Sequence, residues 1–522
     1  MNTGIGTYPR RRATVRPEAV AIEFEGATTT YGAFSERVTR LANALQGLGV
    51  VRGERVAYVG FNHPSLLETF FAANLFGATP VLVNPRLSPA EVEFIVTDSG
   101  AGTVVYGREV ADVGVHLAGA HPQLTLVAAE GPEGPGLRYE ELLAQASTAE
   151  VDAEVDDDDV ALFMYTSGTT GRPKGAMLTH RNLTYQYLNA FTGTDLRQDE
   201  VMLSVAPLFH IAGMNMTTMP TFMMGGRIII HRQFRPADVL AEITRSRVTG
   251  TFMVPAMIDL LAEDPAFAGT DLSSLRSIMV GGSPLSERSI RTWTDRDVKI
   301  VQGFGMTETA PGVCLLEAQD ALSHAGTAGR PHFFSEVRLV DPATGDDVGP
   351  GEPGEVWVRG PQVMKGYWNR PEATEAALAD GWYHTGDIAV RDAEGYYTVK
   401  DRIKDMYISG GENVYPAEVE NALLSLPEVL EAAVVGVPDE RWGETGLAFV
   451  VLREEASAGG DAGAVTSDSS SAGDAVREQL SARLARYKLP REVVVVDELP
   501  RTSTGKIRKN ILRERSAPVT AA

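Results

Sequence analysis

Short apolar runs alternate with helical patterns through the first hundred residues, and this alternation constrains the fold most tightly. Helix signals lie between the runs, such as the capping box of Ser88 and Glu91 with Pro89 at the first helical position. Parallel strands need crossover connections of this length, which helices usually supply. We therefore expect an α/β fold with a largely parallel or mixed sheet covered by helices. Strands are predicted at residues 56–59, 80–83 and 103–106, and helices at residues 31–45, 64–76 and from residue 89.

The pattern changes further along the chain, which predicts more than one domain. With 522 residues, the chain exceeds what one hydrophobic core usually serves. Residues 335–397 hold short alternating runs between Gly- and Pro-rich turns, which is typical of a small antiparallel β unit. After Lys400, helix and strand patterns resume on a smaller scale. Residues from about 454–475 are rich in Ala, Gly, Ser and Asp, so we expect a flexible insertion there.

The stretch from Tyr165 to Lys174 is the most informative part of the chain for function. It follows an apolar run at residues 160–164, so the loop leaves the end of a predicted strand. Its glycines allow close backbone approach to a ligand, and its hydroxyls and lysine supply donors and charge. This composition favours a polyphosphate, although the loop lacks the Gly-Lys-Ser/Thr ending of a Walker motif. The candidate ligand-binding residues are Thr166, Ser167, Gly168, Thr169, Thr170, Gly171 and Lys174.

Four further segments follow in order at residues 303–308, 383–387, 400–405 and 500–506. Together with the loop, they resemble the signature motifs of the adenylate-forming (AMP-binding) superfamily. That superfamily contains acyl-CoA synthetases, luciferases and the adenylation domains of peptide synthetases, and the resemblance covers nearly the whole chain. It implies a large adenylation domain at residues 1–400 and a small mobile α+β C-terminal domain at residues 401–522, with a hinge at Asp401.

The resemblance also implies a two-step reaction. A carboxylate oxygen attacks the α-phosphorus of ATP, pyrophosphate leaves, and the thiol of coenzyme A then attacks the acyl-adenylate. Both steps bring negative charges together, so catalysis depends mainly on positioning and charge stabilisation. We therefore expect ATP, Mg²⁺ and coenzyme A as ligands.

By resemblance, one group of residues handles the phosphates and the metal ion. Glu308 and the Thr166 hydroxyl would hold Mg²⁺, which prefers oxygen ligands. Thr307 would donate to the α-phosphate. Lys506 would bridge the acyl carboxylate and the α-phosphate during adenylation. Alone, Glu308 would more often be a surface or capping residue, and a C-terminal lysine a solvated charge; the combination of motifs favours the functional roles.

A second group would surround the nucleoside, the pantetheine arm and the acid. Phe304 would offer a flat face to adenine, although a lone Phe is more often a core residue. Asp387 would accept hydrogen bonds from both ribose hydroxyls, and His210 would act as a gate near the acyl carboxylate. Gly282, Ser283 and Pro284 would approach the other side of adenine, and Gln302 and Gly303 are further cofactor-binding candidates. The remaining candidates are Arg402 and Lys404 near ribose or phosphate, and Gly410 and Gly411 along the pantetheine arm.

Composition excludes several other classes. The formal charge of −22 argues against nucleic acid as a main partner. The single cysteine, Cys314, allows no internal disulfide, which suits a reducing compartment. No apolar run approaches the ~20 residues that span a bilayer, and no signal-peptide segment follows the arginines at residues 10–12. We expect a cytoplasmic protein, and the sequence leaves a homodimer open.

Several alternative activities remain at this stage. Peptide-synthetase domains carry an aspartate after the phenylalanine where this chain has Phe209 and His210, so an amino acid substrate is disfavoured. A ligase that loads a carrier protein instead of coenzyme A stays open. A kinase-like enzyme would release ADP, and an inactive nucleotide-binding protein would lack competent residues at the motif positions.

The acyl region is rich in methionine. Of the 15 methionines, ten lie between Met202 and Met306, and residues 211–226 contain no charged residue. Methionine lines irregular apolar cavities well, although some of these side chains will simply fill gaps in the core. A dicarboxylic acid would need a fixed cation, and none is evident there. We expect an apolar carboxylic acid, either a fatty acid or an aromatic or polycyclic one.

Overall fold

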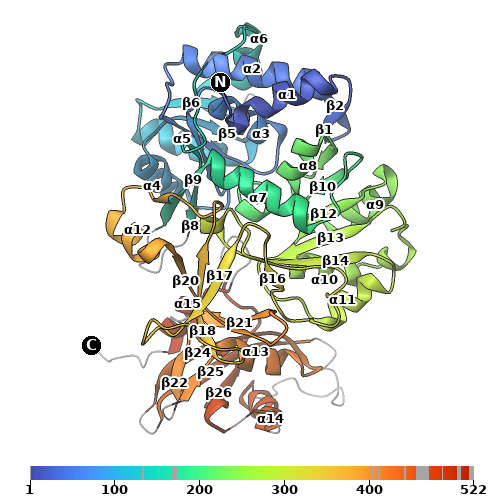
Figure 1. Cartoon of the computed structure of the whole chain (residues 1–522), viewed down its shortest axis with the longest axis vertical. Coiled ribbons are helices and arrows are strands. Elements are labelled where there is room, and N and C mark those ends of the chain that lie inside the picture. The colour runs from blue at the N-terminus through green and yellow to red at the C-terminus, as the bar shows by residue number, and fades with distance from the viewer. Residues whose placement is uncertain are drawn as a thin grey trace. The chain divides into compact units, whose positions relative to one another are not determined.

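The computed structural model describes residues 2–131, 134–151, 153–166, 173–402, 405–409, 412–439, 442–453, 469–481, 483–484, 486–501 and 507–516. Within these ranges the strands form four sheets, and helices cover the two largest (Figure 1). The predicted α/β class is confirmed. No helix of the described ranges is both long and apolar enough to cross a membrane.

The first large sheet has nine strands in the described part of the chain, in the order β16-β15-β14-β13-β12-β10-β11-β1-β2. Strand β1 and strands β10 to β14 are parallel, whereas β2, β15 and β16 pair antiparallel at the two edges. The strands are β1 (Val20–Phe24), β2 (Ala27–Thr30), β10 (Val201–Ser204), β11 (Arg227–Ile230), β12 (Gly250–Met253), β13 (Ser277–Gly281), β14 (Lys299–Phe304), β15 (Cys314–Leu316) and β16 (Arg330–Pro331).

The second large sheet has eight strands among the described residues, in the order β19-β9-β8-β4-β3-β5-β6-β7. It is parallel from β8 to β7, and β9 and β19 add an antiparallel edge. The predicted strands at residues 56–59, 80–83 and 103–106 are confirmed within it. The strands are β3 (Arg55–Val59), β4 (Thr79–Val83), β5 (Ala101–Tyr106), β6 (Thr125–Ala128), β7 (Leu137–Arg138), β8 (Val160–Thr166), β9 (Lys174–Thr179) and β19 (Gly366–Tyr367).

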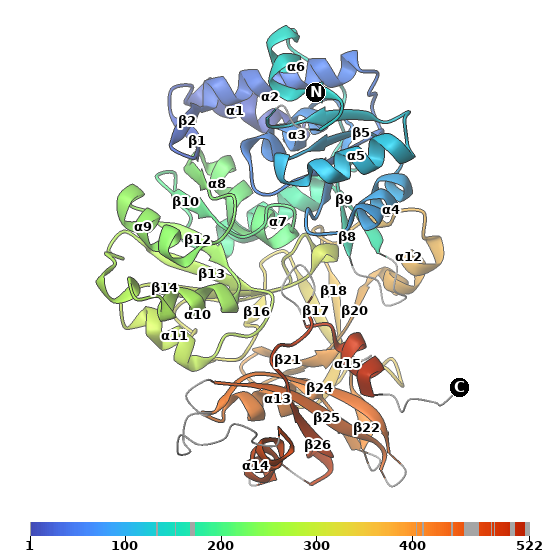
Figure 2. The same ribbon diagram turned by 180° about the vertical axis from the view of Figure 1, so that it is seen from behind.

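Helices lie between the two sheets and on their other faces. Helices α3 and α7 contact the eight-stranded sheet, α2 and α8 contact the nine-stranded sheet, and the two pairs contact each other. On the other face of the nine-stranded sheet, α9, α10 and α11 cover strands such as β13 and β14 (Figure 2), and α4 and α5 cover the eight-stranded sheet. The helices are α1 (Tyr8–Val15), α2 (Tyr31–Gly47), α3 (Pro64–Leu75), α4 (Pro89–Ser99), α5 (Ala111–Ala120), α6 (Tyr139–Gln145), α7 (His180–Gly193), α8 (Met219–Met224), α9 (Pro236–Ser246), α10 (Pro255–Glu263) and α11 (Glu287–Thr294).

Local sequence explains where these helices begin. The Thr30 side chain accepts a hydrogen bond from Ala33 N and caps α2. Ser88 and Glu91 form both halves of the predicted capping box of α4. These caps satisfy backbone donors that the first helical turn leaves without partners.

Two smaller sheets follow in the sequence. The predicted β unit is present as the sheet β17-β18-β20-β21, although helix α12 (Pro371–Ala377), which we did not predict, interrupts it. The last sheet has the order β23-β22-β25-β24, with β26 beside β25, and α13 and α14 pack on its core. The elements are β17 (Glu336–Val340), β18 (Pro353–Arg359), β20 (Tyr383–Arg391), β21 (Tyr397–Arg402), β22 (Tyr407–Ser409), β23 (Glu412–Val414), α13 (Pro416–Leu424), β24 (Val429–Asp439), β25 (Gly443–Leu452), α14 (Ser469–Ser481), β26 (Glu492–Val495) and α15 (Lys509–Ser516).

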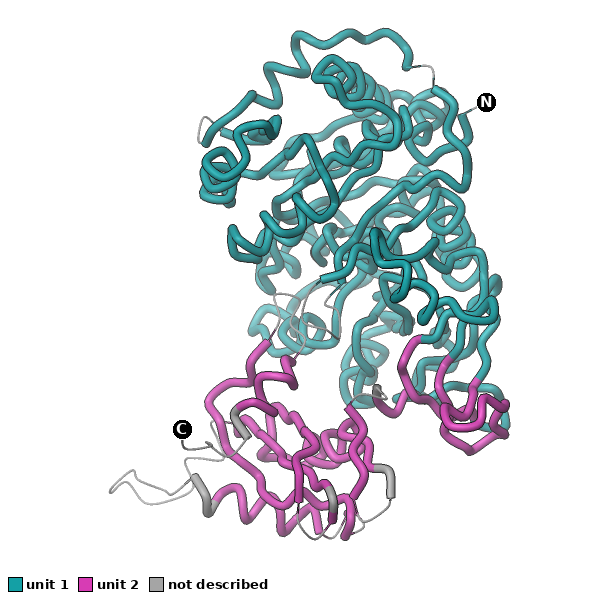
Figure 3. The backbone as a smooth tube through the Cα atoms, turned by 90° about the vertical axis from the view of Figure 1, so that its left-hand side faces the viewer, with its two compact units in different colours: residues 1–338, 357–384, 392–398 teal, residues 339–356, 385–391, 399–522 magenta. Residues whose placement is uncertain are grey.

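The chain divides into two compact units (Figure 3). Unit 1 comprises residues 1–338, 357–384 and 392–398, and unit 2 comprises residues 339–356, 385–391 and 399–522. The main transition at residue 399 lies beside the predicted boundary, but unit 2 also includes two earlier segments. The Asp401 carboxylate accepts a hydrogen bond from Ala417 N at the start of α13, within unit 2. Its role as a hinge stays a prediction.

The predicted insertion needs one correction. Helix α14 begins at Ser469, so residues 469–475 are helical and are not part of a flexible segment. Composition misled the prediction there, because Ser and Ala tolerate a helix and Val476 and Leu480 supply its buried face. Residues 454–468 lie outside the described residues.

Candidate active site

Several candidate residues follow the carboxyl ends of neighbouring parallel strands in unit 1. Strand β10 leads into the loop of His210, β13 ends at the loop of Gly282, and β14 ends at Phe304. In open α/β sheets, ligands bind outside the carboxyl ends of the strands. Five-residue parallel pairing of β13 with β14, from Ser277 to Gly281, brings the last two of these loops side by side.

The phosphate and metal candidates converge where the two large sheets meet. Thr166 ends β8 of one sheet, and Glu308 follows β14 of the other in the 3-10 turn η5 (Thr307–Thr309). The Thr166 hydroxyl lies 3.4 Å from Glu308 Oε1, and the Tyr367 hydroxyl donates to the same oxygen at 2.9 Å. Glu308 is only 8% exposed. The predicted pair of oxygen ligands is thus brought together, and their chemistry fits a hard cation such as Mg²⁺.

Tyr367 is a site residue that the sequence analysis missed. Burial raises the pKa of its hydroxyl above the usual range, and the Glu308 carboxylate raises it further. The hydroxyl therefore stays protonated and can donate to Glu308. Lys174 extends its ammonium over the Tyr367 ring, with Nζ 5.1 Å from the ring centre. A lysine, a carboxylate and two hydroxyls thus share one corner of unit 1.

Strand pairing and hydrogen bonds hold the residues on either side of the phosphate loop. Strands β8 and β9 pair antiparallel, which places Thr166 opposite Lys174. The Tyr165 hydroxyl donates to Asp98 at 2.8 Å, and Arg370 binds the other oxygen of Asp98 at 2.6 Å. Both ends of the loop therefore start from fixed positions. Ser167, Gly168, Thr169, Thr170 and Gly171 of the loop itself lie outside the described residues.

The turn that carries Thr307 and Glu308 requires a glycine. A Cβ atom on Gly305 would lie 1.4 Å from the carbonyl oxygen of Pro311, so no side chain fits there. After this turn, Val313 N donates to Phe304 O at 2.9 Å and closes the segment back onto β14. Phe304 is half-buried, and Gly282, Ser283 and Pro284 of the neighbouring loop are exposed. Phe304 and the loop of Gly282 are thus accessible in unit 1.

Gln302 fixes the conformation of the loops beside β14. Its side chain is 5% exposed; Oε1 accepts from Leu285 N at 3.0 Å, and Nε2 donates to Thr327 O at 2.9 Å. Both ends of the amide are therefore engaged by the protein. The structure supports Gln302 as a residue that positions the loop of Gly282, rather than one free to read a ligand.

The loop of His210 is held by a buried asparagine that the sequence analysis also missed. Asn62 Oδ1 accepts from Leu208 N at 2.8 Å, and its Nδ2 donates to Ala206 O at 3.0 Å. His210 is half-buried, and its ring packs against Phe209 with 4.7 Å between ring centres. Asn62 follows β3 of the other sheet, so nothing in the local sequence signals this contact.

An apolar cluster adjoins His210 and β14. The π-helix η3 (Gly213–Thr218) begins three residues after His210 and carries Met216. Short π-helical stretches often occur at functional sites. Cβ-less Gly303 leaves room for Met216, whose Cε would be 3.1 Å from a Cβ at that position. We call the following residues the acyl-site cluster: Ala206, Met216, Phe252, Met279, Val301 and Leu315, with Ala212 and Ala318 packed against them.

The remaining candidates belong to unit 2 or lie outside the described residues. Asp387 in β20 is 6% exposed, and its backbone N–H donates to the Thr385 hydroxyl at 3.0 Å. Arg402 ends β21. Lys404, Gly410, Gly411 and Lys506 lie outside the described residues. The nucleotide and pantetheine roles of these residues stay predictions.

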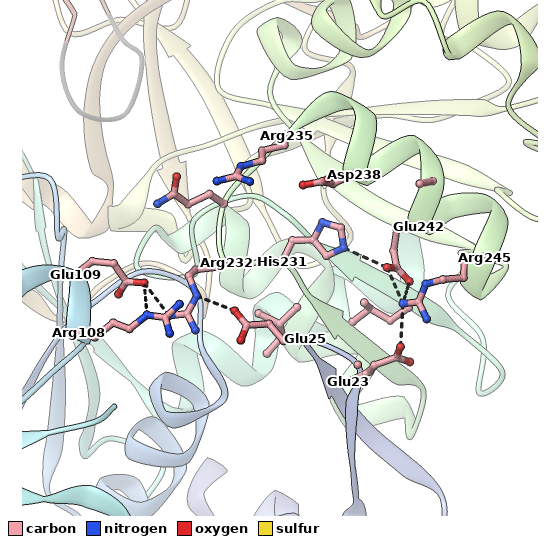
Figure 4. A pocket seen from close by; sticks show the side chains of 15 residues that line it. Glu23, Glu25, Arg108, Glu109, His231, Arg232, Arg235, Asp238, Glu242 and Arg245 are labelled. Atoms are coloured by element: carbon pink, nitrogen blue, oxygen red, sulfur yellow. Dashed lines mark hydrogen bonds and ion pairs between the residues drawn. The ribbon is translucent and has the colours of Figure 1, made fainter. Parts of the chain in front are cut away.

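A separate cavity of about 620 Å³ opens at the ends of β1 and β11 (Figure 4). Its arginines are largely engaged by neighbouring carboxylates: Arg232 binds Glu25 and Glu109, and Arg245 binds Glu242. None of the predicted site residues that the structure describes lines it. This cavity is therefore distinct from the candidate active site.

Comparison with known proteins decides the family. The model of the AMP-binding enzyme family matches residues 9–368, and that of the AMP-binding enzyme C-terminal domain matches residues 418–506. The chain belongs to the AMP-binding enzyme family. The predicted resemblance and the predicted enzyme class, an AMP-forming acid–thiol ligase with acyl-CoA synthetase activity through an acyl-adenylate, are confirmed.

Three similar proteins cover nearly the whole chain. A feruloyl-CoA synthase of Amycolatopsis is 46% identical over 514 residues, covering 98% of this chain and 99% of the relative. An indoleacetate–CoA ligase of Aromatoleum aromaticum is 40% identical over 512 residues, covering 98% of each. The solved o-succinylbenzoate CoA synthetase of Bacillus subtilis is 31% identical, with a TM-score of 0.85 and 99% coverage of both chains, in complex with its acyl-adenylate intermediate.

The same Bacillus enzyme has been solved with ATP and a magnesium ion, at a TM-score of 0.84, 31% identity and 98% coverage of both chains. ATP, Mg²⁺ and coenzyme A are the expected co-substrates and metal of this family of CoA ligases, as predicted. In this chain, the oxygens of Thr166 and Glu308 fit such a metal ion.

Proposed function

We propose that this enzyme activates an aromatic carboxylic acid and transfers it to coenzyme A. The observation that carries the proposal is the adjacency of two environments in unit 1. The oxygens of Thr166 and Glu308 meet at one corner, and the apolar acyl-site cluster lies against Gly303, two residues before the turn of Gly305. The names of the two relatives above, which act on ferulate and indoleacetate, favour an aryl acid over a fatty acid.

In this proposal, the chain's residues orient the reactants and balance charge. Glu308, held by the Tyr367 hydroxyl, and Thr166 would bind Mg²⁺, which would neutralise charge on the phosphates. Lys174 and the loop before it would bind the outer phosphates, and Thr307 would donate to the α-phosphate. The acid's carboxylate oxygen then bonds to the α-phosphorus, and the bond to the pyrophosphate oxygen breaks.

The second half-reaction would follow in the same site. The thiolate of coenzyme A bonds to the acyl carbon, and the bond to the AMP oxygen breaks, so thioester and AMP are the products. We propose that unit 2 presents Lys506 for the first step and Gly410 and Gly411 for the second, turning about Asp401. Asp387 and Arg402 would bind the ribose or phosphate. A cytoplasmic location and a homodimer stay predictions.

The test is pyrophosphate release over a panel of acids. We expect 4-hydroxycinnamate, ferulate and indole-3-acetate to have higher kcat/KM than octanoate, palmitate, acetate and malonate. Hydroxylamine should trap the acyl-adenylate before coenzyme A is added. Release of ADP and phosphate would contradict the reaction itself, and a clear preference for acetate or malonate would contradict the aryl site. If an adenylate forms but coenzyme A does not accept the acyl group, a carrier protein bearing phosphopantetheine is the alternative acceptor to test.

A further inference from the structure

Buried polar side chains lie next to the acyl-site cluster: Gln186 contacts Met216, and a Cβ on Gly312 would touch both Gln186 and His332. Each is at most 5% exposed, and each has a nitrogen or oxygen atom without a hydrogen-bond partner among the described residues. Buried polar groups are nearly always paired, so such a group calls for an explanation. We call these residues the buried polar seam: Gln186, Asn215, His332 and Gln362.

Gln186 contacts the acyl-site cluster through Met216. It lies in α7 and is fully buried. Among the described residues, its Nε2 donates to the Met216 sulfur alone, at 3.6 Å, and a thioether is a weak acceptor. Its Oε1 has no partner among the residues that the structure describes. This amide oxygen is therefore a strong acceptor that the folded chain itself does not use.

The segment that pairs with the end of β14 leaves room for the Gln186 amide. A Cβ on Gly312 would lie 2.2 Å from Gln186 Oε1 and 3.0 Å from His332 Cδ2, so the absence of a side chain at Gly312 makes room for the amide. The next residue, Val313, donates to Phe304 O. Met216 reaches Gly303 on the other side. Methionine is flexible and can yield to a ligand.

The imidazole of His332 strengthens the polar character of this position without adding charge. Burial lowers its pKa to about 4. The ring is thus neutral near pH 7, and the seam presents dipoles rather than an ion. Such a position suits a neutral hydrogen-bonding group and not a second carboxylate, which would need a cation.

We propose that the enzyme selects aromatic acids that carry a hydroxyl at the far end of the ring, and that Gln186 is the specificity-determining residue that accepts the hydrogen bond of this hydroxyl. The inference rests on the proposed aryl-CoA ligase function. The carboxylate would lie toward His210 and β14, and the ring would extend past Gly303 and Met216 to Gln186 Oε1. A site built to bond a substrate hydroxyl rejects the analogue that lacks it, because its own polar group then stays unpaired.

The test compares 4-hydroxycinnamate with cinnamate, which differ only in that hydroxyl. For the wild-type enzyme, kcat/KM in the pyrophosphate-release assay should be at least about tenfold higher for 4-hydroxycinnamate. Gln186→Leu should reduce this ratio about tenfold, which corresponds to about one hydrogen bond, mainly through KM. Gly312→Ala keeps the Gln186 amide but crowds its oxygen, so it should also reduce the ratio. This variant tests the proposal if Gln186→Leu does not fold.

Asn189→Leu is the matched control. Asn189 lies one turn further along α7, is equally buried, and accepts from Phe334 N at 3.0 Å. Its loss should lower the melting temperature and leave the ratio unchanged. A wild-type preference for cinnamate, or equal ratios in wild type, Gln186→Leu and Gly312→Ala, would overturn the role of Gln186. If the wild type adenylates neither acid, the proposed function fails instead, so the two failures are distinguishable.

Discussion

Acidification should destabilise unit 1 through buried histidines, and His332 allows the magnitude to be worked out. Burial lowers its pKa to about 4 in the folded protein, whereas an unfolded histidine titrates near about 6.5. Between these values the unfolded chain binds more protons, so this contribution to stability is complete above about pH 6.5 and is lost as the pH falls toward 4. At about pH 5 the difference in protonation costs about 2 kcal/mol for this one side chain.

His332→Gln removes this pH-dependent contribution to the free energy of unfolding. The variant should be less stable than wild type near neutral pH, because a packed ring is lost, but its free energy of unfolding should fall about 2 kcal/mol less on going from about pH 7.5 to about pH 5. His180, whose pKa burial also lowers to about 4, keeps part of the acid sensitivity in both proteins.

Urea unfolding followed by tryptophan fluorescence measures this in unit 1. Four of the five tryptophans belong to that unit: Trp293, Trp357, Trp368 and Trp382. Asn189→Leu is a control that destabilises the same region without a titrating group. If the stability curves of His332→Gln and wild type run parallel over this pH range, the assignment of a buried neutral imidazole is refuted.

Three further predictions concern the reaction itself. Tyr367→Phe removes the hydrogen bond to Glu308, so the Mg²⁺ concentration for half-maximal pyrophosphate release should rise several-fold. Glu308→Gln should lose two or more powers of ten in kcat. An unchanged Mg²⁺ requirement in Tyr367→Phe would argue against a role of the Tyr367 hydroxyl in metal binding. Gly305→Ala forces a Cβ onto a backbone carbonyl, so adenylation should fall about a hundredfold or more, and wild-type rates in that variant would show that the turn is not rigid. Lys506→Ala should abolish adenylation and retain thioester formation from preformed acyl-adenylate. Asp401→Pro should impair thioester formation more than adenylation. Equal loss of both steps in Lys506→Ala would contradict the proposal that different parts of unit 2 serve the two steps.

The sequence predicted features that depend on local chemistry. Ser88 caps its helix as expected, because a cap involves residues three apart in the chain. The oxygens of Thr166 and Glu308 meet as the family resemblance implied. The predicted end of the insertion at about residue 475 was wrong, because α14 begins at Ser469 and composition alone does not register its buried side.

Features that depend on distant contacts were not predictable in this way. Tyr367 lies 59 residues from Glu308 in sequence, and Asn62 lies 146 residues from Leu208. Gln302 matched a motif by position, yet its amide is engaged by the loop of Leu285. The burial of Gln186 behind Met216 follows from the packing of α7 on η3. Each of these contacts joins elements that only the folded sheets bring together.

Unit 2 is built from three separate segments of the chain, and this affects where hybrid enzymes can be joined. Residues 339–356 and 385–391 cluster with residues 399–522. A crossover near residue 400 would therefore combine a new C-terminal region with two segments of unit 2 that still come from the original chain. Recombinants joined there should therefore depend on compatibility between β18 or β20 and the incoming segment. A donor that supplies everything from residue 339 onward carries the whole of unit 2 with it, and should yield stable hybrids more often than one that supplies only the last 122 residues.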